Sequence, residues 1–200
     1  MKRSIAIALL ILAFIVPTTV CAQDIRGYAG IGLGMSSVDL DYQPIGLGTV
    51  SEDDSDTTFK LFGGIIVNPY FSVDFGYINL GEYSANESGG GSFANFTAEA
   101  SAFYAAAVGH LPLNKKELEA ISLYGKVGLA AWDVDLGLST NLPLVLIETG
   151  DSGTDLMFGI GIQGRYGSET NSWIVRLEYE RFAVSDSDVD ILGVAVAYVF

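Results

Sequence analysis

The feature that most constrains the fold of this chain is a period-two alternation of apolar with small or polar residues. The last nine residues, Leu192 to Phe200, show it plainly: large apolar side chains occupy the even positions, and Gly or Ala fills most of the odd ones. Successive side chains of a β-strand point to opposite faces, so this stretch predicts a strand with one large apolar face. The same period predicts seven more strands, at 28–36, 57–68, 71–79, 97–109, 122–132, 155–165 and 172–182.

Two-faced strands of this kind suit either a soluble barrel or sandwich, which buries its apolar faces, or a membrane barrel, which turns them to lipid. The polar faces combine charged residues with many Gly, Ala and Ser, which fit the narrow interior of an eight-stranded barrel. The apolar faces carry aromatic residues near the strand ends, as barrels do at a membrane–water interface. These are Phe71, Tyr77, Trp173, Tyr179, Tyr198 and Phe200. The sequence therefore predicts an all-β fold, an eight-stranded antiparallel transmembrane β-barrel.

The first 22 residues predict a cleaved secretory signal peptide, which leaves residues 23–200 as the barrel domain. Two basic residues precede an apolar run, Ile5–Val16, and small residues surround a cleavage point after Ala22. The run is shorter than the roughly 18–20 residues that a membrane helix needs. Cys21 is the only cysteine. A lipid anchor there is disfavoured, because Thr-Thr-Val is a poor match to the small residues that usually precede a lipidated cysteine.

The charge of the chain excludes some partners and raises a question about others. The formal net charge is −14 and the pI is about 4.2, so phosphates would repel the chain and a nucleic-acid partner is excluded. The longer stretches between predicted strands hold fifteen acids and neither Lys nor Arg; they are 39–56, 81–95, 133–153 and 183–190. They alternate with short links, as external loops alternate with periplasmic turns in outer-membrane barrels. We expect a solvated surface there or, alternatively, weak collective binding of divalent cations against phosphorylated lipid.

Several stretches resemble the OmpA-type transmembrane domain of Gram-negative bacteria, and the likeness spans 26–200. They are "KLFGGIIVNPYFSVDFGYINLGEYS", "VGHLPL", "GKVGLAAWD", "RLEYERF" and the closing "AYVF". The resemblance implies a multi-pass barrel in the bacterial outer membrane with both ends in the periplasm. Its surroundings would be outer-membrane lipid and lipopolysaccharide. It also implies that Tyr198 and Phe200 belong to a signal read by the β-barrel assembly machinery. The peptidoglycan-binding activity of many family members resides in a further domain and is not carried over.

The charged residues on the polar faces are the candidate site. Four bases and four acids are expected inside the barrel: Lys60, Lys126, Arg165 and Arg176, with Asp74, Glu99, Glu178 and Glu180. In a narrow interior of low dielectric, unpaired charges are costly and pairs are favoured. We expect a salt-bridge plug; the alternative is a gated path of low conductance, because family members suggest that such networks can rearrange.

Three other motifs carry little functional weight. "GIGIQG" (159–164) fits a dinucleotide fingerprint, but its glycines fall inside a predicted strand and no helix is predicted after them. His110, the only histidine, is expected at the periplasmic rim as an interfacial structural residue, away from a catalytic triad. With one histidine and one cysteine, a zinc or iron site is not expected. The sequons "NES" (86–88) and "NFT" (95–97) require a eukaryotic secretory route.

The sequence thus predicts an integral outer-membrane protein that is not an enzyme and needs no cofactor. Its role is expected to be structural support of the envelope or narrow, porin-like passage of solutes. One alternative is an adhesin or immune-evasion protein acting through its loops, which the apolar run "NLPLVLIE" (141–148) favours. A second alternative is a transporter of small hydrophobic compounds, which would need a lateral opening.

Overall fold

The computed structural model describes residues 25–38, 49–53, 55–89, 92–115, 119–140, 147–168, 171–184 and 187–200. The predicted signal peptide and Cys21 lie outside these residues. The strands are β1 (Arg26–Val38), β2 (Thr49–Asp53), β3 (Ser55–Asn68), β4 (Phe71–Gly89), β5 (Ser92–Lys115), β6 (Glu119–Thr140), β7 (Ile147–Gly167), β8 (Ser172–Val184) and β9 (Ser187–Val199). No helix of the described residues is long and apolar enough to span a membrane.

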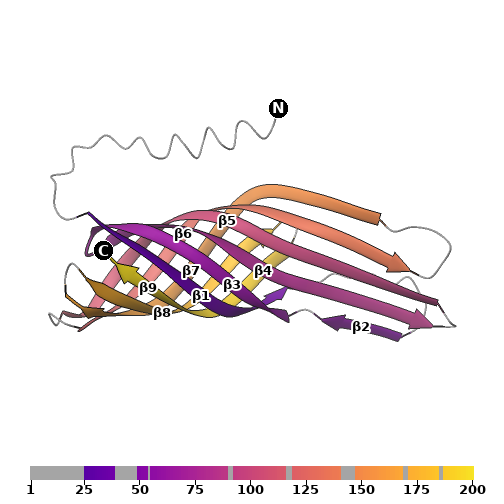
Figure 1. Cartoon of the computed structure of the whole chain (residues 1–200), viewed down its shortest axis with the longest axis horizontal. Helices are drawn as coiled ribbons and strands as arrows, with labels where there is room; N and C mark the ends of the chain where they lie inside the picture. The colour runs from indigo at the N-terminus through magenta and orange to yellow at the C-terminus, as the bar shows by residue number, and fades with distance from the viewer. Residues whose placement is uncertain are drawn as a thin grey trace, which may run out of the picture.

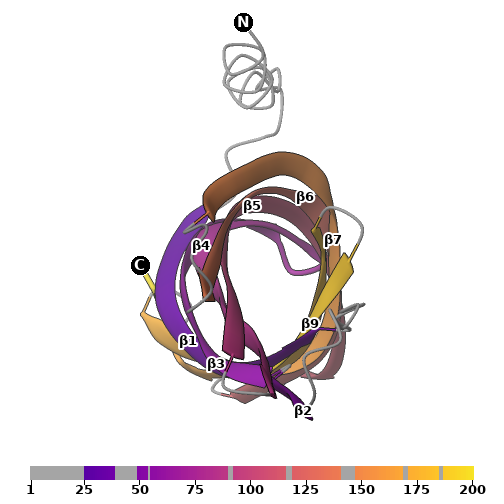
Figure 2. The same ribbon diagram turned by 90° about the vertical axis from the view of Figure 1, so that its right-hand side faces the viewer.

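Eight of these strands close into a barrel (Figures 1 and 2). The strand order is β4-β3-β1-β9-β8-β7-β6-β5, and pairing of β4 with β5 completes the circle. Every neighbouring pair is antiparallel. The short β2 stays outside this circle and pairs with residues 84–88 of β4. The eight-stranded antiparallel barrel predicted from the alternation is therefore confirmed.

The register fixes how far the strands tilt. Following paired residues once around the barrel from Tyr28 leads back to β1 at Val38, ten residues further along that strand. With a rise of about 3.3 Å per residue and a strand spacing of about 4.7 Å, a stagger of ten over eight strands gives a tilt of about 40°. Such a barrel has an interior just wide enough for side chains to fill it.

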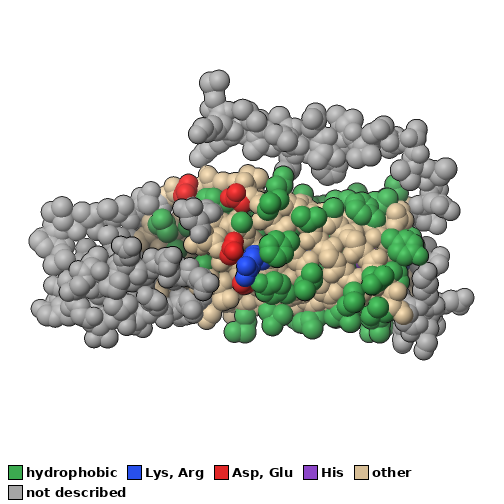
Figure 3. Space-filling view, turned by 180° about the vertical axis from the view of Figure 1, so that it is seen from behind, with side chains coloured by type: hydrophobic (Ala, Val, Ile, Leu, Met, Phe, Trp, Pro, Cys, Tyr) green, Lys and Arg blue, Asp and Glu red, His purple; other side chains and the backbone are tan. Residues whose placement is uncertain are grey.

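The two faces of the barrel wall are as predicted for seven of the eight strands. Large apolar side chains point outward and are exposed, among them Leu33 at 59% and Ile160 at 65%. Figure 3 shows these side chains as a broad apolar band, with the few visible charged side chains gathered at one border of the band. An outward apolar band of this kind faces lipid in a transmembrane barrel. Most glycines of the seven predicted segments lie on the opposite face, toward the lumen, with seven of the eight charged residues of the candidate site: Lys60, Asp74, Lys126, Arg165, Arg176, Glu178 and Glu180.

The exception is β5, where the prediction for Glu99 is wrong. Ala102, Tyr104 and Val108 are buried in the lumen, whereas Glu99 is exposed on the outer face beyond the apolar band. The polar residues at one end of this strand suggested the opposite orientation. Facing inward, the small alanine side chains instead leave room for the large side chains of the neighbouring strands.

The strands on one side of the barrel are much longer than predicted. The stretches 81–95 and 133–153, expected as loops, largely belong to strands, since β4 and β5 pair up to Gly89 and Ser92 and β6 and β7 pair up to Leu138 and Ile147. The four strands extend beyond the rest of the barrel at the end opposite the start of β1 and the C-terminus (Figure 1). Acidic residues do not prevent strand formation here, because pairing satisfies the backbone whatever the side chains are.

The start of β1 and the end of β9 meet at the other end of the barrel, which we call the termini end. Phe200 N donates to Gly27 O at 2.9 Å, and Gly27 N donates to Phe200 O at 3.2 Å. These bonds extend the β1–β9 seam by one further pair, as closure in a lipid environment requires.

Candidate functional site

The lumen of the barrel holds the candidate site. Six charged side chains lie there, each at most 4% exposed: Lys60, Asp74, Lys126, Arg176, Glu178 and Glu180. Three are bases and three are acids, so the set is electrically neutral. Neutrality matters because each charge loses its hydration inside the barrel and must recover that free energy from its partners.

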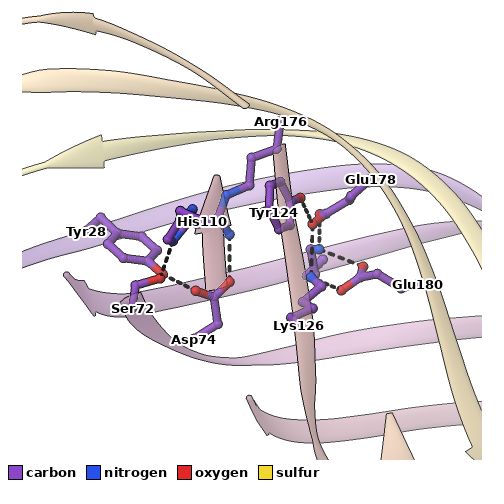
Figure 4. Close-up of polar contacts among 10 residues, drawn as sticks. Tyr28, Ser72, Asp74, His110, Tyr124, Lys126, Arg176, Glu178 and Glu180 are labelled. Carbon is purple, nitrogen blue, oxygen red and sulfur yellow. Dashed lines mark hydrogen bonds and ion pairs between the residues drawn. The ribbon is translucent and has the colours of Figure 1, made fainter. Parts of the chain in front are cut away.

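The first group of the network joins opposite walls. Arg176 on β8 donates from Nη1 to Asp74 Oδ2 on β4 at 2.6 Å. Three strands separate β4 from β8 in either direction around the barrel, so this contact spans the lumen. Tyr28 Oη donates to the other oxygen of the same carboxylate (Figure 4).

Aromatic rings enclose the Arg176 guanidinium. Its Cζ atom lies 5.2 Å from the ring centre of Tyr28, 5.1 Å from that of Phe62 and 5.3 Å from that of Tyr124. A guanidinium over aromatic faces gains cation–π attraction, which is stronger when water is excluded. The planar group is thus held by its charge partner and by packing.

The second group is a box of two lysines and two glutamates. Lys60 Nζ pairs with Glu178 and, at 2.7 Å, with Glu180. Lys126 Nζ pairs with Glu180 and, at 2.9 Å, with Glu178. Tyr124 Oη donates to Glu178 Oε2 at 2.7 Å. Each ammonium therefore contacts both carboxylates, and the loss of any one member leaves the others buried without full compensation.

Glycines on β7 make room for this box. A Cβ atom added to Gly159 would lie 2.8 Å from Lys126 Cε, and one added to Gly161 would lie 2.7 Å from Tyr124 Cζ. The glycines of "GIGIQG" are therefore explained by close packing inside a strand, in agreement with the rejection of a dinucleotide site.

An apolar layer covers the charged groups on the side away from the termini. Its side chains are at most 2% exposed and come from four strands: Ile78, Leu80, Met157, Phe182 and Ile191. The sequence did not predict this layer, although all five residues fall at the inward positions of predicted strands or of their direct continuations. These residues were not expected in the lumen, because apolar residues were expected to face lipid.

Little open space remains beside the ion box. A cavity of about 10 Å³ adjoins Lys60, Glu178 and Glu180 and the glycines of β1. That volume suits about one water molecule. Salt bridges below and apolar side chains above thus fill the middle of the lumen.

The remaining predicted site residues lie apart from the network. Arg165 is half-buried, nearer the termini, and its Nε donates to Ser172 Oγ at 2.7 Å. Glu99 is on the outer surface, as described above. Tyr198 and Phe200 point outward; Tyr198 packs on Trp173 with ring centres 5.1 Å apart and donates to Asn171 Oδ1 at 3.0 Å.

His110 lies at the termini end of the lumen, where a catalytic role finds no support. Its Nε2 is 2.9 Å from Ser72 Oγ. The Nδ1 atom, which a catalytic triad would pair with a carboxylate, has no hydrogen-bond partner among the described residues. Within those residues no group of His, Cys, Asp and Glu has the arrangement of a metal site.

Comparisons with known proteins agree with this architecture. A family model described as an outer membrane protein beta-barrel domain matches residues 6–200. No curated protein sequence matches the chain. Among solved structures, Ail of Yersinia pestis in complex with the heparin analogue sucrose octasulfate is similar, with a TM-score of 0.54 and 18% identity over 89% of this chain and 100% of that one.

Two further solved structures are also similar to the chain. A second structure of Ail from Yersinia pestis has a TM-score of 0.53 and 16% identity, again over 89% of this chain and 100% of that one. The N-terminal β-barrel domain of OprF from Pseudomonas aeruginosa has a TM-score of 0.46 and 11% identity over 89% and 100% of the two chains. At these identities the likeness concerns the fold alone.

Proposed function

The chain belongs to the family of outer membrane protein β-barrel domains, and from this premise we propose that it is a closed barrel that supports the envelope rather than conducting solutes. It is an integral β-barrel of the bacterial outer membrane. The observation that carries the proposal is the filled lumen. A neutral set of six charges bridges the walls, and an apolar layer lies directly beyond it. A hydrated ion would have to break salt bridges and then cross that layer.

Planar-bilayer recording tests the closed lumen. The chain from residue 23 onward, reconstituted at single-molecule density, should give no more conductance steps than a protein-free bilayer. Steady conductance in most insertions would overturn the proposal and favour the gated path. The variant Phe182→Ala opens the apolar layer but leaves the six charges in place, so it should also remain closed.

Two features of biogenesis belong to the same proposal. Residues 1–22 are a signal peptide that is removed after Ala22, and the C-terminal strand with Tyr198 and Phe200 is recognised by the assembly machinery. Supporting the first point is the layout of basic, apolar and small residues at the N-terminus. The intact mass of the protein extracted from outer membranes should correspond to a chain that begins at Gln23; a retained leader or an added lipid on Cys21 would contradict it.

A catalytic function is not proposed. The imidazole of His110 lacks the carboxylate partner of a triad among the described residues, and its neighbour Ser72 is 1% exposed. A transporter with a lateral opening is not proposed either, because β1 and β9 pair over eleven consecutive residue pairs and every other neighbouring pair of barrel strands is also hydrogen-bonded; β7 lacks a β8 partner only where it extends beyond that strand.

A second candidate function is the binding of an extracellular partner by the protruding strands. The favouring observation is the outer half of β7, which pairs with β6 from Ile147 onward but with β8 only from Met157 onward. Such a strand edge can accept an added strand from a partner. The chain has no Lys or Arg between 127 and 164, while Asp133, Asp135 and Asp151 are exposed there, so a basic partner is favoured.

The ligand expected from the charge of this surface differs from the ligand in the Ail structure. The Ail structure contains a sulfated heparin analogue, whereas an acidic surface should repel such a ligand. Cells displaying the protein should therefore bind immobilised polylysine-rich peptides more than heparin. Stronger retention on heparin at physiological salt would contradict this second function.

A further inference from the structure

The end of the lumen nearest the chain termini holds polar side chains that the ion box does not use. We name this group the basal cup and define it by Ser72, His110, Gln163, Arg165 and Arg176. Ser72 and Arg176 are 1% exposed, whereas the other three are half-buried. The cup is therefore closed toward the ion network and accessible from the end with the termini.

His110 and Arg176 both lie close to Tyr124, and Gln163 lies next to Arg176 in the barrel wall. Gln163 on β7 and Arg176 on β8 are directly paired, and both point into the lumen. Side chains of directly opposed residues start about 4.5–5.5 Å apart at Cβ. The ring of His110 is centred 6.0 Å from the ring of Tyr124, and Arg176 Cζ is 5.3 Å from the same ring. Figure 4 shows the His110 ring beside the Arg176 side chain.

Three buried polar atoms of the cup have no hydrogen-bond partner among the described residues. They are Arg176 Nε, His110 Nδ1 and Gln163 Oε1. Buried polar atoms are rarely left in this state, so each such atom calls for a ligand or a water molecule. Arg176 Nε always carries a hydrogen and can only donate.

The other two positions can also present donors. When the Ser72 hydroxyl donates to His110 Nε2, the neutral imidazole carries its hydrogen on Nδ1. The oxygen and nitrogen of a glutamine amide exchange places by a simple turn about the last torsion angle, so Gln163 can present its NH₂ group instead. The cup then offers three N–H donors, and Arg176 places a positive charge beside them.

We propose that the basal cup binds a small oxyanion of the phosphate type, held by Arg176 Nε, His110 Nδ1 and the turned Gln163 amide. Arginine is well suited to phosphate oxygens, since its fixed donors match their geometry and its charge persists at all relevant pH values. The site is independent of whether the barrel conducts.

NMR of the arginine Nε–H signals tests the site directly. The mature chain in a maltoside detergent, which carries no phosphate, is titrated with inorganic phosphate and separately with chloride at equal ionic strength. We expect the Arg176 Nε–H signal to shift saturably with phosphate and not with chloride. Gln163→Leu and His110→Phe should each weaken the apparent affinity about tenfold or more, because each removes one hydrogen bond to a charged group.

The control variant is Thr58→Val, which changes a buried side chain in the upper lumen and should leave the titration unchanged. Nanodiscs with phosphatidylglycerol, without free phosphate, provide the second arm: a shifted Arg176 signal there would identify a lipid headgroup as the source of the oxyanion. Absence of a saturable shift in both arms would overturn the proposal and leave water in the cup. Unchanged affinity in both cup variants, each still closed as a heat-modifiable barrel, would overturn it equally.

Discussion

Arg176 and Asp74 are 102 residues apart in the sequence, yet Arg176 Nη1 lies 2.6 Å from Asp74 Oδ2 across the lumen. The contact ties β8 to β4 on the opposite wall. Among the described residues, each salt bridge of the lumen joins strands that are not neighbours, since Lys60 and Lys126 reach Glu178 and Glu180 on β8 from β3 and β6. The described ion network therefore acts as a set of cross-braces inside a wall that backbone pairing already closes.

Arg176→Leu should strongly destabilise the barrel. The change leaves the Asp74 carboxylate, which is 0% exposed, without its cation, and breaking a buried pair costs about 3–5 kcal/mol. Leu177→Ile alters a lipid-facing side chain that is 51% exposed and should cost little. Urea-induced unfolding in lipid vesicles measures both, and equal midpoints would contradict the assignment of inner and outer faces. The double change Asp74→Leu with Arg176→Met should recover much of the loss, because no lone charge then remains.

Gly161→Ala should disturb the ion box by crowding. The added Cβ would lie 2.6 Å from Leu177 O and 2.7 Å from Tyr124 Oη, so the tyrosine must move away from Glu178. Overpacking of this kind costs about 1–3 kcal/mol. Gly109→Ala is the matched control, since nothing lies within 4 Å of a Cβ added there. A thermal-unfolding series in detergent that ranks Gly109→Ala as the more damaging change would refute this packing.

Phe200→Ala should reduce the amount of protein that reaches the outer membrane. The substitution keeps both main-chain bonds between Phe200 and Gly27, whereas deletion of Phe200 would remove them and confuse closure with recognition. The ring itself is 64% exposed, so its loss should cost the folded barrel little. We expect normal refolding in vitro together with accumulation in the periplasm in vivo, and normal behaviour of Phe200→Tyr. Reduced refolding with normal export would instead assign the ring to packing.

Chelation of divalent cations should destabilise the barrel in lipopolysaccharide-containing bilayers more than in neutral detergent. Glu82, Glu99 and Asp135 are exposed and directly paired across β4, β5 and β6, so their repulsion adds to that of nearby lipid phosphates within a Debye length of about 8–10 Å. Bridging Mg²⁺ or Ca²⁺ would relieve it collectively. Replacing the three by Gln, Gln and Asn should shrink the difference in EDTA response between the two media.

Asp56→Asn provides the contrast for that experiment. Asp56 was grouped by sequence with the other acids of 39–56, and the side chains of Glu52, Asp53 and Asp54 lie outside the described residues. Its own carboxylate accepts hydrogen bonds from Thr57 N at 2.6 Å and Glu82 N at 2.8 Å. The substitution should therefore lower stability equally in both media, with no change in the EDTA difference. Equal EDTA responses in every variant would leave the acids as a solvated surface.

Much of the fold was predictable because alternation is a local property. In β7, Ile160 and Ile162 alternate with Gly159 and Gly161, and this difference in side-chain size distinguishes the lipid face from the lumen face. On β5 the rule failed, since alanine suits both faces and the charge of Glu99 was taken as a sign of burial. The register of β5 with β4 and β6 sets the height of Glu99 along the barrel axis. At that height the outer face of the barrel lies beyond the apolar band, so Glu99 meets water.

The lengths of the strands could not be predicted from the sequence either. The acids of 133–153 are typical of a loop, but residues 133–138 and 147–152 pair with each other in β6 and β7, because each strand supplies the hydrogen bonds of the other. Local composition indicates whether a segment is polar enough to be solvated, whereas strand pairing depends on a partner segment that is distant in the chain.

By itself, then, the sequence determined the eight segments from which the barrel wall is built and, for seven of them, which side chains point inward, because both follow from a period of two. Tertiary structure alone decided which inward charges meet, that the apolar layer covers them and that Arg176 leaves one donor facing the basal cup. The physical reason is the stagger of the barrel: a shift of ten residues around eight strands sets the height of each side chain, and Coulomb attraction and packing act between side chains at the same height.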